Sequence, residues 1–236
     1  MIICKQSFKK NNIMNEILEK LFTCIEFGKI NTASPYPPQM RGQEGAMELT
    51  KQALDAGIAP SEIMDSALIP AMTRVGQKFT EGQVFVPQML LSAKAMNAAL
   101  THIKPFFQSG EVKRKGTFVI GTVFGDLHDI GKNLVCMMVE GAGWEVIDLG
   151  VDVSAEKFID AIKAHPGAHV GLSALLTTTM TNMKTIIDKV HETYPEVKFI
   201  VGGAPVSAEF AKEIGADGYA ADPQDDIKIL ESFLNA

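Results

Sequence analysis

Cysteine is scarce in this chain of 236 residues, and long apolar runs are missing. The three cysteines, Cys4, Cys24 and Cys136, are too few and odd in number, which excludes a disulfide scaffold. They also lack the spacing of a metal knuckle. No apolar stretch approaches the ~18 residues that span a bilayer. The first ten residues hold only a short apolar run before their charges, so we expect no secretory signal, no membrane anchor and a cytoplasmic location.

An excess of positive charge is also missing, since the formal net charge is −6. Proteins that bind a phosphate backbone usually carry a basic face, so we expect no nucleic-acid partner. The sequence has neither a Gly-x-Gly-x-x-Gly turn after its first expected strand nor a Walker-type loop, which argues against dinucleotide and nucleotide binding. It does have a hydrophobic fraction of 46%, enough for a packed core and for one or two domains.

The N-terminal half has the apolar spacing of helices. After a tail at 1–14, residues 15–108 show apolar side chains at i, i+3 and i+4, interrupted at 31–42 by three prolines within four residues. The periodicity resumes over 46–56, 60–79 and 87–103. Four helices with short connections predict a four-helix bundle.

The pattern changes after a polar, glycine-bracketed segment at 109–116, which we interpret as a linker. Over 117–236, short β-rich runs alternate with amphipathic helical stretches. The expected strands are 117–124, 144–149, 168–174, 197–201 and 218–221, and the expected helices are 129–142, 154–164, 178–194, 207–214 and 223–234. Five strand–helix units predict a five-stranded parallel sheet, flavodoxin-like or Rossmann-like, with helices on both faces.

Ligands of an open parallel sheet bind outside the carboxyl ends of its strands. The loops that follow the first, third and fourth expected strands, at 125–132, 173–179 and 202–205, are rich in Gly, Ser, Thr, Asp and His. Because all three lie on one rim, we expect them to form one site. Gly202-Gly203 removes side chains where a bulky ligand approaches the backbone, although a strand-ending turn explains the same pair.

His128 is the candidate metal ligand. Asp126, two residues earlier in the same loop, can accept a hydrogen bond from one ring nitrogen and make the other a better ligand. The alternative is an ordinary loop histidine, with Asp129 as a helix N-cap. The other four histidines lack such a neighbour, and we expect them on the surface. One histidine is too few for a protein-only metal site, so most of the coordination would come from a cofactor.

The segment Asp126-Leu127-His128-Asp129-Ile130-Gly131 resembles the D-x-H-x-x-G fingerprint of cobalamin-binding domains. The likeness continues at Ser173-Ala174-Leu175 and at Gly202-Gly203, in the same order and at similar separations. Residues 75–88 resemble the helical cap of methionine-synthase-type modules, and the likeness spans about 43–235. The chain is therefore similar to the corrinoid proteins of anaerobic methyltransferase systems. The segment at 31–42 is longer and richer in proline than the usual cap turn.

The resemblance implies a role for each matching residue. His128 would be the lower ligand of cobalt, Asp126 would bind its imidazole, and Thr179 would extend that relay. The further cofactor-binding residues it implies, along the fingerprint, the slot for the nucleotide tail and the cap, are Asp129, Ile130, Gly131, Ser173, Leu175, Thr177, Gly202, Gly203, Phe79, Val86 and Met89. For the last three, core packing of a methionine-rich bundle is the alternative.

The implied function is that of a methyl carrier, not of a complete enzyme. Its corrinoid would accept a methyl group on Co(I) from a substrate-specific methyltransferase and pass it to a second one, for an acceptor such as tetrahydrofolate or a thiol coenzyme. A reductive activase is a further implied partner. The alternatives are the small subunit of an adenosylcobalamin-dependent mutase, a cobalamin-based sensor and a structural α/β domain without a cofactor.

Overall fold

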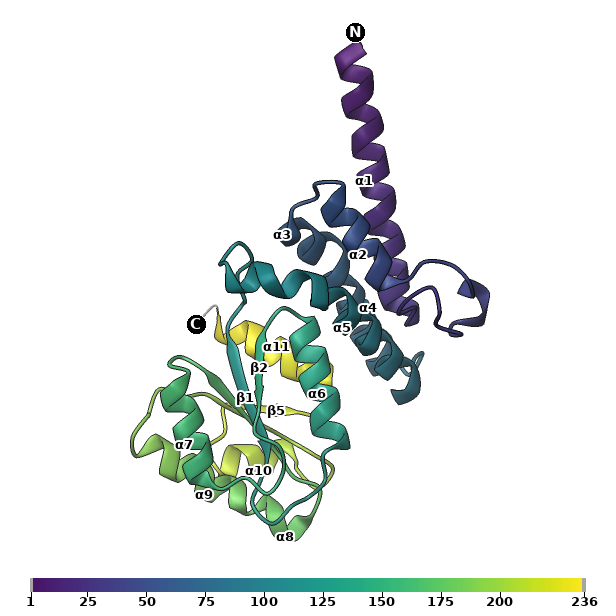
Figure 1. Ribbon diagram of the computed structural model, residues 1–236. Helices are drawn as coiled ribbons and strands as arrows, with labels where there is room; N and C mark the ends of the chain where they lie inside the picture. The colour runs from purple at the N-terminus through teal and green to yellow at the C-terminus, as the bar shows by residue number, and fades with distance from the viewer. Residues whose placement is uncertain (1, 235–236) are drawn as a thin grey trace. The chain divides into compact units, whose positions relative to one another are not determined.

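The computed structural model describes residues 2–234, with side-chain positions from residue 13 onward except at 108, and the chain divides into two compact units at 113/114 (Figure 1). The boundary lies inside the segment 109–116 that the sequence analysis interpreted as a linker. Within the described residues, no helix has the length and apolar character needed to cross a membrane.

The first unit is helical. It contains α1 (Ile2–Phe27), a 3-10 turn (Pro38–Met40), α2 (Ala46–Asp55), α3 (Pro60–Ile63), a π turn (Met64–Leu68), α4 (Ile69–Thr80) and α5 (Val86–Gln108). Helices α1, α2, α4 and α5 pack on one another and bury the apolar stripes that the sequence spacing predicts. The helix α1 runs through most of the segment 1–14, which the sequence analysis set aside as a tail.

The expected helix at 60–79 is interrupted by the π turn. Pro70 lies in the first turn of α4, directly after the π turn. A proline inside a helix provides no N–H and crowds the carbonyl four residues earlier. The wider π turn separates α3 from α4 at this point, so one predicted helix becomes three segments.

The second unit is a parallel sheet between helices. Its strands are β1 (Thr117–Thr122), β2 (Glu145–Asp148), β3 (His169–Ser173), β4 (Phe199–Gly202) and β5 (Gly218–Ala220). Its helices are α6 (Ile130–Gly141), α7 (Ala155–Ala164), α8 (Thr177–Met180), α9 (Asn182–His191), α10 (Ala208–Glu213) and α11 (Pro223–Phe233). The strand order β2-β1-β3-β4-β5 is the flavodoxin-like one of the two predicted arrangements, and every pairing is parallel.

The two faces of the sheet bury alternate side chains. Helices α7, α9 and α10 cover one face and α6 and α11 the other (Figure 1). In β1, Val119 joins the core beneath α7 and α9, whereas Phe118 and Ile120 belong to the opposite face. Phe118 occupies the space that a side chain at Gly171 on the neighbouring strand would need. Because helices cover both faces, ligands can reach the sheet only at the ends of its strands, and the carboxyl ends carry the loops described below.

The helix expected at 178–194 is divided into α8 and α9, which meet at Thr181. The other predicted elements of this unit agree with the structure within a few residues. Ser207 and Asp222 cap α10 and α11 with side-chain hydrogen bonds to Phe210 N and to Gln224 and Asp225 N. Ser154 occupies the N-cap position of α7 without such a bond.

Candidate functional site

The loop after β1 holds a buried carboxylate at the carboxyl edge of the sheet. Gly125 has φ +81°, and its N–H donates to Asp152 Oδ1 at 2.7 Å. The Asp152 N–H in turn donates to the Asp126 carbonyl at 3.0 Å. These contacts turn the chain sharply, so that the side chain of Asp126 points inward and has no exposed surface.

The Asp126 carboxylate joins two neighbouring loops. Its Oδ2 accepts hydrogen bonds from the Thr179 hydroxyl at 2.7 Å and from the N–H groups of Leu175 and Leu176 at 2.8 and 3.3 Å. Burial alone would raise the pKa of Asp126, but the bonds from Thr179, Leu175 and His128 outweigh it and hold this pKa well below its usual value. The group is therefore an anion at neutral pH.

The same carboxylate orients the His128 ring. Asp126 Oδ1 lies 2.7 Å from His128 Nδ1 and also accepts the His128 N–H at 3.1 Å. Because an ionised carboxylate can only accept, Nδ1 must carry the proton, and in the neutral ring Nε2 keeps its lone pair. The Thr122 hydroxyl fixes the loop further by donating to the His128 carbonyl at 2.9 Å. The side chain of His128 is 51% exposed, so a metal ion can reach Nε2 while the hydrogen bonds of the loop hold the ring in place.

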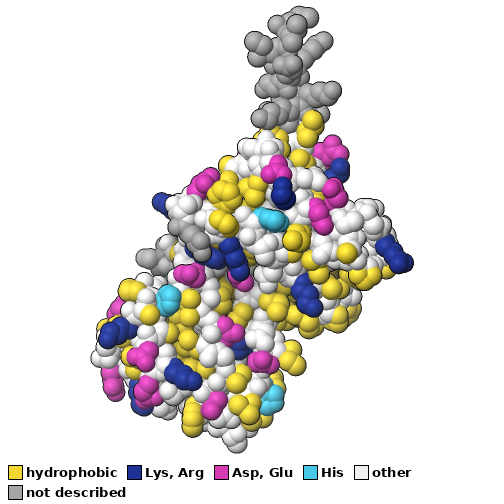
Figure 2. Space-filling model, viewed as in Figure 1, with side chains coloured by type: hydrophobic (Ala, Val, Ile, Leu, Met, Phe, Trp, Pro, Cys, Tyr) yellow, Lys and Arg dark blue, Asp and Glu magenta, His cyan; other side chains and the backbone are white. Residues whose placement is uncertain are grey.

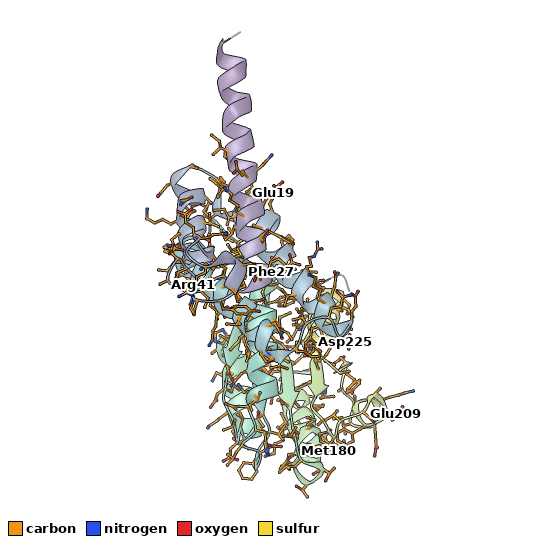
Figure 3. All side chains as sticks on the ribbon, turned by 90° about the vertical axis from the view of Figure 1, so that its right-hand side faces the viewer. Glu19, Phe27, Arg41, Met180, Glu209 and Asp225 are labelled. Atoms are coloured by element: carbon orange, nitrogen blue, oxygen red, sulfur yellow. The ribbon has the colours of Figure 1, made fainter. Side chains whose placement is uncertain are left out.

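Large apolar side chains are exposed on the two loops that Asp126 joins and at the start of α6. The exposed fractions are 57% for Phe124, 72% for Leu127, 77% for Ile130, 45% for Leu175 and 42% for Leu176. Several large apolar side chains exposed close together in the chain are typical of a binding surface. The helix α8, marked by Met180 in Figure 3, follows the second loop beyond the ends of the strands.

A cavity of about 150 Å³ opens among α6, α11 and the carboxyl ends of β1, β3, β4 and β5. Gly131, Ser173, Gly202 and Gly203 line it, together with Lys132 and Asp226. Gly203 has φ +121°, and a Cβ there would collide with the Ala174 carbonyl, so only glycine fits. A Cβ at Gly131 would meet no atom within 4 Å, so the packing of the protein does not require glycine at this wall of the cavity.

Most of the predicted site residues come together at this edge. Asp126, His128 and Thr179 form one network, and Ser173 with the three glycines lines the cavity. Asp129 occupies the N-cap position of α6 without a capping bond, and its carboxylate accepts from Asn133 Nδ2 at 3.0 Å. Thr177 is exposed at the start of α8, and no hydrogen bond connects it to Asp126.

The three predicted cap residues lie in the helical unit. Phe79 is half-buried, Val86 is 37% exposed and Met89 is fully buried. Full burial fits the alternative of core packing for Met89, and the predicted contacts of all three with a cofactor stay predictions. Phe85, which the sequence analysis did not select, is 64% exposed next to Val86.

The expectation that the other four histidines lie on the surface is wrong. His102, His165, His169 and His191 are all half-buried. His169 lies between the rings of Trp144 and Phe233, with centroids 6.0 and 5.0 Å away, and burial lowers its pKa. Aromatic contacts between strands and helices have no short-range sequence signature, which is why spacing alone missed them.

Four residues of the site escaped sequence reasoning. Thr122 and Asp152 shape the loop around Asp126, and Lys132 and Asp226 are buried polar residues beside the cavity. Lys132 Nζ pairs with both Asp148 oxygens at 2.6 Å. Asp226 was hidden in the sequence because acidic residues in the first turn of a helix are ordinary. Across the described residues, no cluster of three or more His, Cys, Asp or Glu side chains could hold a metal ion.

Comparison with known proteins connects both units to cobalamin. Residues 116–228 and 42–104 each match a family described as a B12 binding domain. The chain is 39% identical to trimethylamine corrinoid protein 1 of Methanosarcina acetivorans over 196 residues, 81% of this chain and 91% of that protein. A solved cobalamin-binding protein of Desulfitobacterium hafniense matches with a TM-score of 0.67 and 31% identity, over 79% of this chain and 89% of that chain. The methanol:cobalamin methyltransferase complex MtaBC of Methanosarcina barkeri matches with a TM-score of 0.78 and 30% identity, over 94% and 80%.

Proposed function

This chain belongs to the family of B12-binding corrinoid proteins, and we propose on that basis that it carries a methyl group between methyltransferases. His128 and the residues around it would hold a corrinoid, whose cobalt would supply the site for methyl transfer from one methyltransferase to a second, for an acceptor such as tetrahydrofolate or a thiol coenzyme. The likeness to the methanol:cobalamin methyltransferase complex supports a methyltransferase partner. The second methyltransferase, a reductive activase and a cytoplasmic location complete the proposal.

The observation that carries this proposal is the Asp126–His128 pair on an apolar rim. The carboxylate fixes the proton on Nδ1, so Nε2 is ready to bind cobalt without a change of tautomer. Exposed Leu127, Ile130 and Leu175 around the histidine offer the apolar surface that a flat macrocycle covers. The ring position is set before the cofactor arrives, which lowers the ordering cost of ligation.

The cavity is suited to the nucleotide tail that His128 would displace from cobalt. Gly131, Gly202 and Gly203 leave its walls without side chains, and Ser173 provides a polar group at its edge. Together with the histidine, these residues would bind the cofactor at two points. From the helical unit, Phe79 and Val86 would shelter the opposite face of the corrin, whereas the full burial of Met89 places it in the core of the helices. Asp129, Ile130, Leu175 and Thr177 would contact the ring or its side groups.

Titration with cobinamide, a corrinoid without a nucleotide base, tests the lower-ligand role. We expect one corrinoid per chain, and the Co(II) form should show the electron paramagnetic splitting of a single axial nitrogen, which only the protein can supply. His128→Ala should abolish the splitting. His165→Ala, which removes a half-buried imidazole elsewhere in the same unit, should keep it. No uptake of corrinoid, or an unchanged splitting in His128→Ala, would overturn the proposal.

A further inference from the structure

Asp226 is a buried acid without a partner. It lies in the first turn of α11, is 7% exposed and lines the cavity. Among the described residues, no side chain or backbone group donates a hydrogen bond to its carboxyl. Among the described residues, the fully buried side-chain atoms without a partner belong to His102, Trp144 and Gln224, so the oxygens of Asp226 keep accessible surface. Because Asp226 lines the cavity, a group inside the cavity can pair with its carboxyl.

No cation on the surrounding elements neutralises Asp226. The facing groups on its own helix are Asp222 and Asp225, the latter labelled on α11 in Figure 3. From α6, Lys132 is held by Asp148 and Asn133, and Cys136 is a thiol whose pKa burial raises to about 12. From β5, the ionisable Tyr219 packs against the core on the opposite face of the sheet.

This setting keeps the Asp226 carboxyl protonated near neutral pH. Burial raises its pKa to about 8, and the negative charges of Asp222 and Asp225 add to the effect. A protonated carboxyl offers one O–H donor and one carbonyl acceptor. The cavity around it is mostly apolar, and cavities of roughly 150 Å³ are known to hold a benzene ring.

We infer that Asp226 selects the base at the end of the corrinoid tail by donating a hydrogen bond to an unprotonated ring nitrogen. This inference rests on the proposed function, in which the cavity receives the tail. Bases with such a nitrogen, namely benzimidazoles and purines, would pair with the carboxyl. A phenolic base such as cresol has no ring nitrogen and would leave the carboxyl unpaired. Asp226 is then a specificity-determining residue for the form of the cofactor.

Equilibrium binding of three corrinoids to the apo chain tests the inference. The ligands are cobamides with a benzimidazole or a cresol base, and cobinamide as the ligand without a base. At pH 6 we expect a preference of about tenfold or more for benzimidazole over cresol, the size of effect seen when a buried donor is left unpaired. Asp226→Leu, of similar size and apolar, should reduce the preference to less than about threefold. Cobinamide should bind equally to both proteins.

The pH dependence supplies a second readout. Between pH 6 and pH 9 the wild-type preference should fall as the carboxyl ionises, because the anion cannot donate. Asp226→Asn keeps an N–H donor and does not titrate, so its preference should persist and stay flat with pH. Equal binding of both bases to the wild type, or an unchanged preference in Asp226→Leu, refutes the role of Asp226. Failure of cobinamide itself to bind refutes instead the proposed function.

Discussion

Gly131 offers a substitution that separates stability from binding. It is the second residue of α6, it lines the cavity, and a Cβ there meets nothing within 4 Å. Gly131→Ala should therefore fold normally and gain about 0.5 kcal/mol, because alanine loses less backbone entropy in a helix than glycine. Isothermal chemical unfolding of the apo chain measures this gain.

The same methyl group should weaken binding of a complete cobamide. Each added carbon occupies space in a cavity of about 150 Å³. Overfilling a well-packed site costs about 1–3 kcal/mol, which corresponds to about 5- to 150-fold in the dissociation constant. Gly131→Leu should weaken it further. The control ligand is cobinamide, which lacks the nucleotide base and should bind all three proteins alike.

The comparison has a clear refuting result. Should Gly131→Leu bind a complete cobamide as tightly as the wild type, the tail does not enter this cavity. Should Gly131→Leu lose cobinamide as well, the substitution has disturbed the histidine loop instead. Only the combination of intact cobinamide binding and weakened cobamide binding agrees with the geometry around α6.

Further substitutions test the site one contact at a time. Thr179→Val removes the hydroxyl bond to Asp126 at similar volume and should cost about 1.5–3 kcal/mol in the unfolding free energy, measured by urea titration. Gly203→Ala should lower the free energy of unfolding by at least about 1–3 kcal/mol from backbone strain alone, because alanine disfavours φ +121°. The added methyl group would also meet the Ala174 carbonyl, so the thermal midpoint should fall. An unchanged midpoint would contradict the close approach of these two backbone segments. Because the pKa of Asp126 is lowered in the folded protein, this group stabilises the fold fully above its unfolded pKa of about 4, and this stabilisation is lost as the pH falls below that value. The loss of folded protein with falling pH, followed by circular dichroism, should therefore be less steep in Asp126→Asn. An equally steep loss in that variant would refute the low pKa.

The hydrophobic periodicity of the sequence and the positions of its loops predict most of the fold. The strands of the second unit are short apolar runs with helices between them, so their order along the chain already implied a covered parallel sheet. The choice between flavodoxin-like and Rossmann-like order depends on which strands pair, a long-range property that spacing does not encode. The π turn before Pro70 and the division of α8 from α9 interrupt helices that the apolar spacing predicts as continuous.

The site was predictable where its residues are adjacent in sequence. Asp126 and His128 share one loop, and the alternation of acid and histidine suggested their hydrogen bond. Asp226 lies near the end of the chain, and its burial depends on how α11 packs against α6. No local pattern distinguishes it from Asp225, which is more exposed and pairs with Lys228. On the face of the molecule that Figure 2 shows, positive and negative side chains are intermixed, in agreement with the absence of a basic excess in the sequence.

Asp126 binds both the His128 ring and the backbone of the loop after β3, so the orientation of the imidazole depends on a part of the chain that is distant in sequence. The two amides that grip the carboxylate belong to Leu175 and Leu176, 49 and 50 positions later. A proline or a one-residue deletion at that place would release the ring although it leaves the fingerprint segment untouched. The redox behaviour of a cobalt ion held there would thus be adjustable by sequence changes that no motif search inspects.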